Sequence, residues 1–485
     1  MQVEVDVSFG LPIFTMVGLP DASVRESRDR VRSAIRNSGF EFPPHRVTVN
    51  LAPADVRKAG SAFDLPIALG ILAAQGVVRR RDIHDVAVLG ELSLDGAIQA
   101  ARGVLPIAAA VRRHGVQQIL LPTPNASEAA VVEGLTVLPV ATLSDAVAAL
   151  NDPAAVATRA LPQPASATDE VPDLRDVHGQ LFAKRALEIA AAGGHNLLFV
   201  GPPGSGKTMM ARRMPGIMPA LTFDEAIEVT SVHSVAGLLP QGSGLITRRP
   251  FRSPHHTVSS IALIGGGAHP RPGEVSLAHH GVLFLDEMLE FNRFALDVLR
   301  QPLEEGVVSI SRVARTAVFP ARFLLVGAMN PCPCGFAGDT RRECRCTPLQ
   351  IARYRSRLSG PLRDRLDLTV EVPAVAADQL TSDGTGESSA VVKHRVAFAR
   401  ARQFERQGND GAPVNAQLAS SLIARHARPD RAGMRLLHAA IERLQLSARA
   451  YDRIRKVART IADLAGAESV GADHVAEALQ FRMPL

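Results

Sequence analysis

Residues 196–214 read NLLFVGPPGSGKTMMARRM, and this stretch decides the fold of the centre of the chain. The apolar run 196–200 predicts a buried strand, residues 201–206 a glycine-rich turn, and the residues from Lys207 onward a helix. In that order they indicate a phosphate-binding loop, because glycines let backbone N–H groups surround a polyphosphate and the helix N-terminus adds positive potential. The loop consists of Gly201, Pro202, Pro203, Gly204, Ser205, Gly206, Lys207 and Thr208.

Two residues of this loop and two acids further along have the chemistry of nucleotide hydrolysis. Lys207 is expected to reach the β- and γ-phosphate oxygens of ATP, and the Thr208 hydroxyl to ligate Mg²⁺. GVLFLDE, residues 281–287, predicts a second buried strand that ends in Asp286 and Glu287. Because ligands bind at the C-terminal ends of parallel strands, Asp286 is expected at the Mg²⁺ and Glu287 at the attacking water. Two solvated acids at a strand end are the alternative.

Further polar residues stand at the ends of predicted elements. ARFLLVGAMN, residues 321–330, predicts a third buried strand, and Asn330 at its end can orient the attacking water. Arg363 and Arg365 precede another apolar strand, and an arginine there can stabilise charge on the γ-phosphate of a neighbouring subunit. Arg449 begins a basic helix and is a candidate to reach the phosphate from there. For each arginine, a surface salt bridge is the alternative.

All the cysteines of the chain lie in NPCPCGFAGDTRRECRC, residues 330–346, which follows directly from the third strand. Two C-x-C pairs in one loop fit a tetrahedral Zn²⁺ site, although C-x-C is tighter than the usual spacing. A redox-labile disulfide pair and free thiols are the alternatives. The candidate ligands are Cys332, Cys334, Cys344 and Cys346.

The strand and helix patterns predict an α/β protein in three parts. Residues 1–150 alternate strands with helices, and they start so abruptly with a strand that we expect an N-terminal truncation. Residues 151–173 have the composition of a linker. Residues 174–390 contain the phosphate-binding loop, with a parallel sheet, and residues 391–485 read as a helical bundle.

Charge and hydropathy restrict the partners and the cellular compartment that we expect. The net charge is +6, and residues 391–485 hold 16 lysines and arginines against 9 acids, which favours either a polyanion partner or a solvated helical surface. No long uncharged apolar run predicts a transmembrane helix, and no signal peptide is evident, so we expect a cytoplasmic protein without a membrane partner.

Two stretches are candidates for contact with DNA phosphates, with an ordinary surface as the alternative. Residues 306–319 alternate like a hairpin and carry Arg312 and Arg315. Residues 248–281 combine arginines and glycines with a group of histidines whose spacing does not indicate a metal site. These histidines are His255, His256, His269, His279 and His280.

Taken together, these stretches resemble the magnesium-chelatase-like AAA+ ATPases of the YifB/ComM family. VGLPDASVRESRDRVRSAIRNSGFEFP (17–43), FRSPHHTVSSIALIGGG (251–267) and LSGPLRDRLDL (358–368) carry the resemblance, which covers almost the whole chain. It implies a Lon-protease-like domain over residues 1–150, an AAA+ core and a C-terminal helical lid. It also implies that Asp286 and Glu287 form the Walker B pair, Asn330 is sensor 1, Arg365 the arginine finger and Arg449 sensor 2.

The resemblance implies a hexameric ATP-driven motor with helicase or branch-migration activity on transforming DNA. A chelatase-type or chaperone-like remodeller of proteins, without a nucleic-acid role, is the alternative. We expect no proteolysis from the Lon-like domain. The turn KAGSAFD places Ala62 where the nucleophile would align and Ser61 one position early, and no lysine lies between Lys58 and Lys184 to activate a serine.

Overall fold

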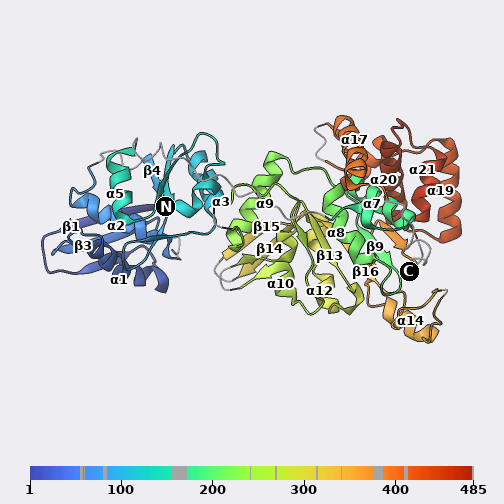
Figure 1. The fold of residues 1–485 in the computed structure, drawn as a ribbon, viewed down its shortest axis with the longest axis horizontal. Coiled ribbons are helices and arrows are strands. Elements are labelled where there is room, and N and C mark those ends of the chain that lie inside the picture. The colour runs from blue at the N-terminus through green and yellow to red at the C-terminus, as the bar shows by residue number, and fades with distance from the viewer. Residues whose placement is uncertain are drawn as a thin grey trace. The chain divides into compact units, whose positions relative to one another are not determined.

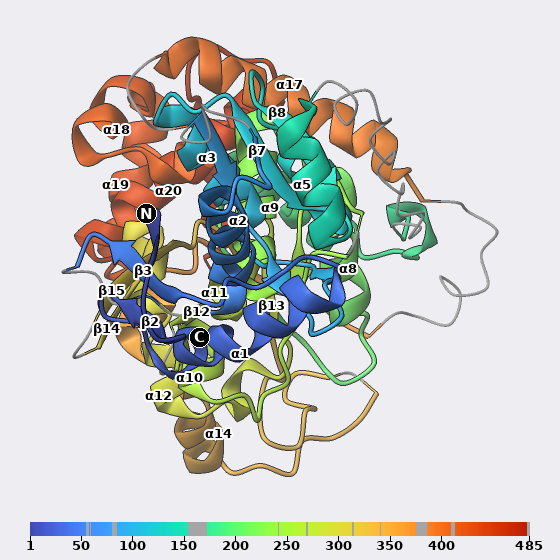
Figure 2. The ribbon, with the colours of Figure 1, turned by 90° about the vertical axis from the view of Figure 1, so that its left-hand side faces the viewer.

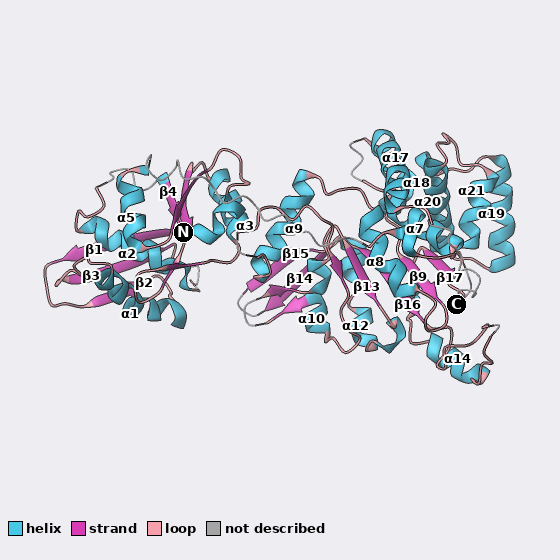
Figure 3. Cartoon of the chain, viewed as in Figure 1, coloured by secondary structure: helices cyan, strands magenta, loops and turns pink. Residues whose placement is uncertain are grey.

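A computed structural model describes residues 1–54, 58, 60–79, 85–153, 172–240, 242–267, 270–312, 315–339, 341–374, 386–408 and 413–482. The chain divides into two compact units, Met1–Ala167 with Thr230–Ile246, and Thr168–Val229 with Thr247–Leu485. Both combine strands with helices (Figures 1 and 3), which confirms the predicted α/β class. Most of the predicted linker, residues 154–171, lies outside the described residues. The three-part boundaries and the Lon-like identity stay a prediction.

The first unit contains two three-stranded sheets. One has the order β1-β3-β2, with β1 antiparallel and β2 parallel to β3, and the other is parallel with the order β4-β7-β8. Apolar residues of α1 and α2 share one core with strand residues. The main elements are β1 (Gln2–Ser8), β2 (Phe14–Val17), α1 (Ala22–Asn37), β3 (Arg46–Ala52), α2 (Asp64–Ala74), β4 (Val86–Val88), α3 (Val104–Arg113), β7 (Gln118–Pro122), α4 (Ala126–Ala129), β8 (Thr136–Val140) and α5 (Leu143–Asn151).

Residues 86–94 form two short strands rather than one. β4 ends at Val88, and β5 (Glu91–Leu92) leaves it to pair with β6 (Ile98–Gln99). Gly90 lies between the two, where a Cβ atom would come 2.9 Å from both Ile98 and Leu65. The chain turns at a glycine because the core leaves no room there for a side chain.

Residues Thr230–Ile246 belong to the first unit, although the sequence pattern places them within residues 174–390. They include the end of α9 (Phe223–Ala236). The Ser234 carbonyl accepts the Gly103 N–H at 3.3 Å, the Ser234 hydroxyl donates to the buried Glu128, and the Gly242 N–H donates to the Pro124 carbonyl at 3.2 Å. These contacts join residues more than a hundred positions apart, so local sequence patterns do not reveal them.

The second unit is built on a five-stranded parallel sheet of order β10-β13-β16-β9-β17. Alternate residues of β9 enter two different cores, Leu197 and Phe199 on one face and Leu198 and Val200 on the other. Helices therefore cover both faces, as parallel sheets require. The strands are β9 (Leu197–Val200), β10 (Phe251–Arg252), β13 (Val282–Leu285), β16 (Leu324–Met329) and β17 (Leu368–Glu371).

The connections of this sheet carry short helices and one hairpin. The hairpin pairs β14 (Val307–Arg312) with β15 (Arg315–Pro320), as the alternating pattern predicts. The helices are α7 (Leu181–Gly193), α8 (Lys207–Ile217), α10 (Ser260–Ile264), α11 (Glu274–Leu277), α12 (Arg293–Asp297), α13 (Arg300–Glu305), α14 (Pro348–Arg355) and α15 (Gly360–Arg363).

The C-terminal region is helical, as predicted, and Figure 2 shows its orange-to-red helices gathered in one group. Ile454, Val457 and Ile461 of α20 recur at helical spacing and are buried, so α20 forms the inner helix of the group. No helix in the described part of the chain is long and apolar enough to cross a membrane. The helices are α17 (Ser389–Gln407), α18 (Ser420–His426), α19 (Arg431–Leu444), α20 (Ala448–Leu464) and α21 (Ala472–Gln480).

Candidate functional site

The predicted phosphate-binding loop connects the buried strand β9 to the first residue of α8, Lys207. Gly201 begins the loop where a Cβ atom would lie 2.1 Å from the Val372 carbonyl oxygen, so the two backbones meet without room for a side chain. Gly206 ends the loop with φ +89°, in the left-handed region that glycine occupies without strain. Backbone N–H groups at the start of α8 then face the loop, as a site for anions requires.

Lys207 is buried within the loop, and among the described residues no hydrogen bond joins its ammonium to a carboxylate. Its ammonium donates to the carbonyl oxygens of Gly201 at 2.7 Å and Pro202 at 2.8 Å, and to Asn330 Oδ1 at 3.4 Å. Burial lowers the pKa of Lys207 to about 8, although the charges of Asp286 and Glu287 oppose this shift. The buried hydroxyl of Ser205 also lacks a partner among the described residues. A polyphosphate would supply an anion to the ammonium and an acceptor to the hydroxyl.

Thr208 and Asp286 lie together beside this lysine. The Thr208 hydroxyl donates to Asp286 Oδ2 at 2.7 Å, because β13 carries Asp286 to the edge of the sheet where α8 begins. A hydroxyl and a carboxylate are the hard oxygen ligands that Mg²⁺ prefers. The residues present therefore fit a magnesium ion bound together with a nucleotide.

Glu287 follows with an unusual backbone, since φ is +49° at a residue other than glycine. Such left-handed residues cost about 1–3 kcal/mol and cluster at functional sites. The conformation turns the side chain toward solvent, where it is 57% exposed, and places Oε2 3.5 Å from His256 Nδ1. Glu287 thus lies beside the phosphate-binding loop with a carboxylate that water can reach.

The sequence analysis missed the contact with His256, because it considered this histidine only as a candidate for contact with DNA phosphates or as ordinary surface. The strand before it, β10, has only two residues, yet it pairs in parallel with β13. Parallel strands end at the same edge of a sheet, so the residues after Arg252 arrive near those after Leu285. A polar segment directly after an apolar residue, RSPHH, was the available signal.

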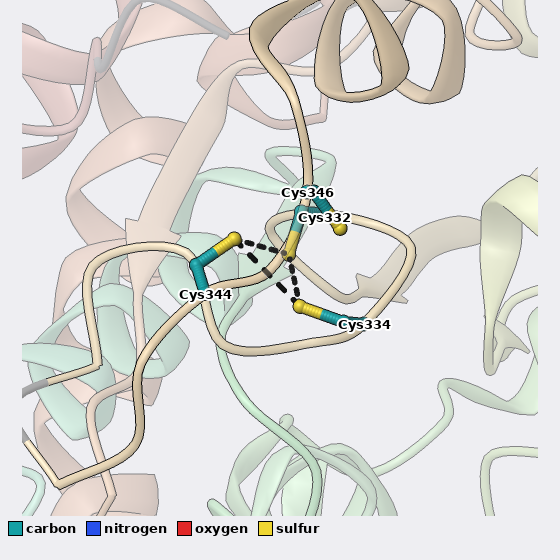
Figure 4. Close-up of side chains that lie close together, drawn as sticks. All are labelled: Cys332, Cys334, Cys344 and Cys346. Atoms are coloured by element: carbon teal, nitrogen blue, oxygen red, sulfur yellow. Dashed lines mark hydrogen bonds between the residues drawn. The ribbon is translucent and has the colours of Figure 1, made fainter.

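Asn330 occupies the end of β16, between β13 and β9, and its side chain accepts from Lys207 as described. Its side chain thus lies beside the phosphate-binding loop, and its role stays a prediction. The cysteine-containing loop continues from Asn330, and the four thiols converge within it (Figure 4).

Arg365 and Arg449, two of the three arginines singled out in the sequence, lie near each other. Arg365 is largely buried, pairs with Glu304 and donates to the Pro361 carbonyl at 2.6 Å. Burial, and then the positive charges of Arg300, Arg449 and Arg453, lower the pKa of Arg365. The Arg449 side chain is 66% exposed, and its Nη1 atom lies 4.0 Å from Asp364 Oδ2. Within the described residues no hydrogen bond or ion pair joins either arginine to residues 201–208.

The histidines form structural contacts rather than a metal site. Glu228 lies 2.8 Å from Nε2 of both His279 and His280, a grouping that could ligate a cation. However, His279 Nδ1 accepts the backbone N–H of Arg322 at 3.0 Å, so the ring carries its proton on Nε2. A metal at Nε2 would move this proton to Nδ1, against the Arg322 N–H. His269 lies outside the described residues.

Much of the basic charge in the C-terminal helices is used inside the protein. Arg406 and Arg459 pair with Asp463, Arg400 donates to the Ala191 carbonyl and Arg455 to the Ile423 carbonyl. Three exposed arginines and a histidine lie around a hollow of about 790 Å³ at α19. It is lined by Arg428, Arg431, Arg435 and His438, with Pro429, Asp430 and Met434. In the hairpin, the backbones of Arg312 and Arg315 are paired, but their side chains are not described.

In the first unit, the Ser61 hydroxyl donates to Glu91 and the buried Lys58 ammonium to the Pro53 carbonyl. Serine and lysine therefore have different partners. The expectation of no proteolysis stays a prediction.

Comparisons with known proteins cover nearly the whole chain. The family model described as magnesium chelatase, subunit ChlI, matches residues 173–380, a second ChlI model matches residues 3–125, and the ChlI C-terminal model matches residues 386–482. The competence protein ComM of Haemophilus influenzae is 46% identical over 99% of this chain and 94% of its own length. The uncharacterised protein YifB of Escherichia coli is 45% identical over the same shares, 99% and 94%. A magnesium-chelatase 67 kDa subunit of Chlorobaculum tepidum is 26% identical over 32% of this chain and 23% of its own length.

Proposed function

The chain belongs to the YifB/ComM family, with a magnesium-chelatase-type AAA+ core, and from this we propose that it is an ATP-hydrolysing motor that acts on DNA. The observation that carries the proposal is the meeting of Lys207, Thr208, Asp286, Glu287 and Asn330 at one edge of a parallel sheet. Family membership supports the ATPase motor. The action on DNA is the further step.

In the proposed reaction, Lys207 and the loop N–H groups would hold the phosphates, and Thr208 and Asp286 would hold Mg²⁺. Bound Mg²⁺ neutralises phosphate charge and thereby assists cleavage. Glu287 accepts the proton of the attacking water, and the Asn330 amide orients that water. His256 follows β10 and lies 3.5 Å from the Glu287 carboxylate, which it would help to position.

Arg365 and Arg449 would complete the site of a neighbouring subunit. They lie near each other, and burial and the positive charges of Arg300, Arg449 and Arg453 lower the pKa of Arg365, while Glu304 and Asp364 offset part of this charge. An adjacent phosphate would relieve this mutual repulsion, as arginine fingers do for transition-state charge. AAA+ proteins act as oligomers, and we propose a hexamer in which each interface carries one such site.

For DNA, we propose α19 as a contact surface. Arg431, Arg435 and His438 recur at intervals of four and three residues, so they share one face of the helix, beside the hollow described above. Exposed arginines on one face can bind successive phosphates without reading sequence. The name of the Haemophilus relative, a competence protein, supports the proposal that the DNA is taken up for transformation and recombined by helicase or branch-migration activity.

A protein remodeller of the chelatase or chaperone type is the alternative. The chelatase subunit of Chlorobaculum aligns with only 32% of this chain, whereas ComM aligns with 99% of it. The internal use of several C-terminal arginines favours this alternative, since it reduces the charge available to DNA. The exposed basic face of α19 favours a motor that binds DNA.

The two functions differ in the response of ATP hydrolysis to single-stranded DNA over a salt series. A DNA motor should be stimulated, and its DNA affinity should fall steeply with salt. Arg435→Ala should reduce the slope of log K against log salt by about 0.7 if Arg435 contacts one phosphate. The matched control is Arg443→Ala, because Arg443 is also exposed on α19 but does not line the hollow. No stimulation and no binding at low salt would exclude the DNA motor and leave the remodeller.

Besides ATP and Mg²⁺, we propose a Zn²⁺ ion as a third cofactor. This ion would stabilise the structure and take no part in the reaction. Its place is the four-cysteine loop.

A further inference from the structure

The four cysteines of the loop lie close enough to share one ion. Their sulfur atoms all lie within 4.8 Å of one another (Figure 4). Cys332 Sγ is 3.3 Å from Cys334 Sγ and 3.7 Å from Cys344 Sγ, and Cys334 Sγ is 3.7 Å from Cys344 Sγ. A tetrahedral zinc site with Zn–S bonds of about 2.3 Å sets its sulfurs about 3.8 Å apart. All four cysteines are free, since a disulfide needs sulfurs about 2.05 Å apart.

Backbone N–H groups point at each of the four sulfur atoms. Cys332 accepts the Ala337 N–H at 3.3 Å, and Cys334 accepts the N–H groups of Phe336 and Arg345. Cys344 accepts the N–H of Cys346, and Cys346 accepts that of Cys334. The sulfurs are thus surrounded by backbone donors, an arrangement that suits metal-bound thiolates. Four thiolates at this separation repel one another unless a cation lies among them, and N–H groups of this kind orient metal ligands.

The same loop packs on the nucleotide site. Cys332 is fully buried just after Asn330, whose amide oxygen contacts Lys207. Gly335, with φ +87°, turns the chain where a Cβ atom would lie 2.7 Å from Pro203 of the phosphate-binding loop. Arg355 of α14 donates to the Pro331 carbonyl at 3.3 Å and so fixes the start of the loop. Any rearrangement of the four sulfurs therefore shifts the segment that positions Asn330.

We infer that the four thiolates bind one Zn²⁺ ion, and that this ion fixes the loop against Pro203 and so keeps Asn330 in contact with Lys207. Four sulfur ligands leave no open position, so the ion is structural. The second half of the inference rests on the proposed ATPase function, while the zinc site itself does not. Asn330 is then a residue whose position depends on the metal.

The first measurement is the metal content of the full-length chain, purified under reducing conditions. We expect one zinc per chain, released by a thiol reagent and detected with a chromogenic chelator. Co²⁺ in place of zinc should give the visible absorption of a tetrahedral thiolate site. Metal content well below one per chain in reduced protein, without that absorption, would overturn the zinc site. So would a disulfide or four free thiols in the protein as isolated.

The second measurement compares Cys344→Ser with Glu343→Ser, a matched change in the same loop that keeps all four thiols. Cys344→Ser should weaken zinc binding at least about tenfold and lower ATP turnover, and Glu343→Ser should change neither. Circular dichroism checks that Cys344→Ser is folded. If it is not, removal of zinc from the wild type by a chelator replaces it. Zinc loss with unchanged turnover would overturn the link to Asn330. A wild type that binds zinc but does not hydrolyse ATP would refute the ATPase and leave the zinc site standing.

Discussion

Replacement of Glu287 by Gln tests the assignment of the base. The substitution keeps the shape of the side chain and removes its negative charge. Because Glu287 is 57% exposed and packs against little, the free energy of unfolding should change by no more than about 0.5 kcal/mol. The left-handed backbone, φ +49°, imposes the same strain on both residues. Any loss of activity would therefore come from the chemistry and not from the fold.

The expected effect is confined to turnover. A general base contributes about 10²- to 10⁴-fold to a rate, which corresponds to about 3–5 kcal/mol of activation free energy. ATP affinity should persist or increase slightly in Glu287→Gln, because one carboxylate leaves the neighbourhood of the phosphates. The assay is steady-state phosphate release, together with the binding of a fluorescent ATP analogue.

The matched control is Glu290→Gln, the same chemical change at a nearby acid. Glu290 is 45% exposed and pairs with Arg357 at 3.0 Å, a surface ion pair of small energy. This variant should keep wild-type turnover. If Glu287→Gln also hydrolyses ATP at the wild-type rate, Glu287 is not the base.

Three further predictions concern the remaining groups. Burial lowers the pKa of Lys207 to about 8, so ATP affinity should fall about tenfold per pH unit above that value as the ammonium loses its proton. A Lys207→Met variant should not show this pH dependence. A wild-type ATP affinity that does not change with pH would contradict the prediction. His256→Ala should lower turnover at unchanged ATP affinity because Glu287 loses its partner, whereas His255→Ala should not; equal effects of the two would refute the positioning. Fluorogenic peptides should not be cleaved, and cleavage that disappears in Ser61→Ala would contradict this.

The sheet and its site were predictable because their signals are local. The buried runs 197–200, 282–285 and 324–329 are apolar throughout, and each leads into polar residues. Parallel pairing then brings Lys207, Asp286 and Asn330 to one edge, whatever the rest of the chain does.

Other features depend on contacts between residues distant in sequence, which no local pattern reveals. The two residues of β10 are too few for a periodicity, yet their pairing with β13 brings His256 to Glu287. Arg406 and Arg459 look like surface charge in the sequence but pair with the buried Asp463. The association of Thr230–Ile246 with the first unit depends on hydrogen bonds to residues near positions 103 and 124.

In the proposed hexamer, one subunit supplies the phosphate-binding loop and its neighbour supplies Arg365. The most direct measurement is ATP turnover in a mixture of two inactive variants, Lys207→Ala and Arg365→Ala. The account predicts that the mixture hydrolyses ATP faster than either variant alone, since some interfaces then combine an intact Lys207 with an intact Arg365. A mixture that forms mixed oligomers and stays as inactive as its components would contradict it.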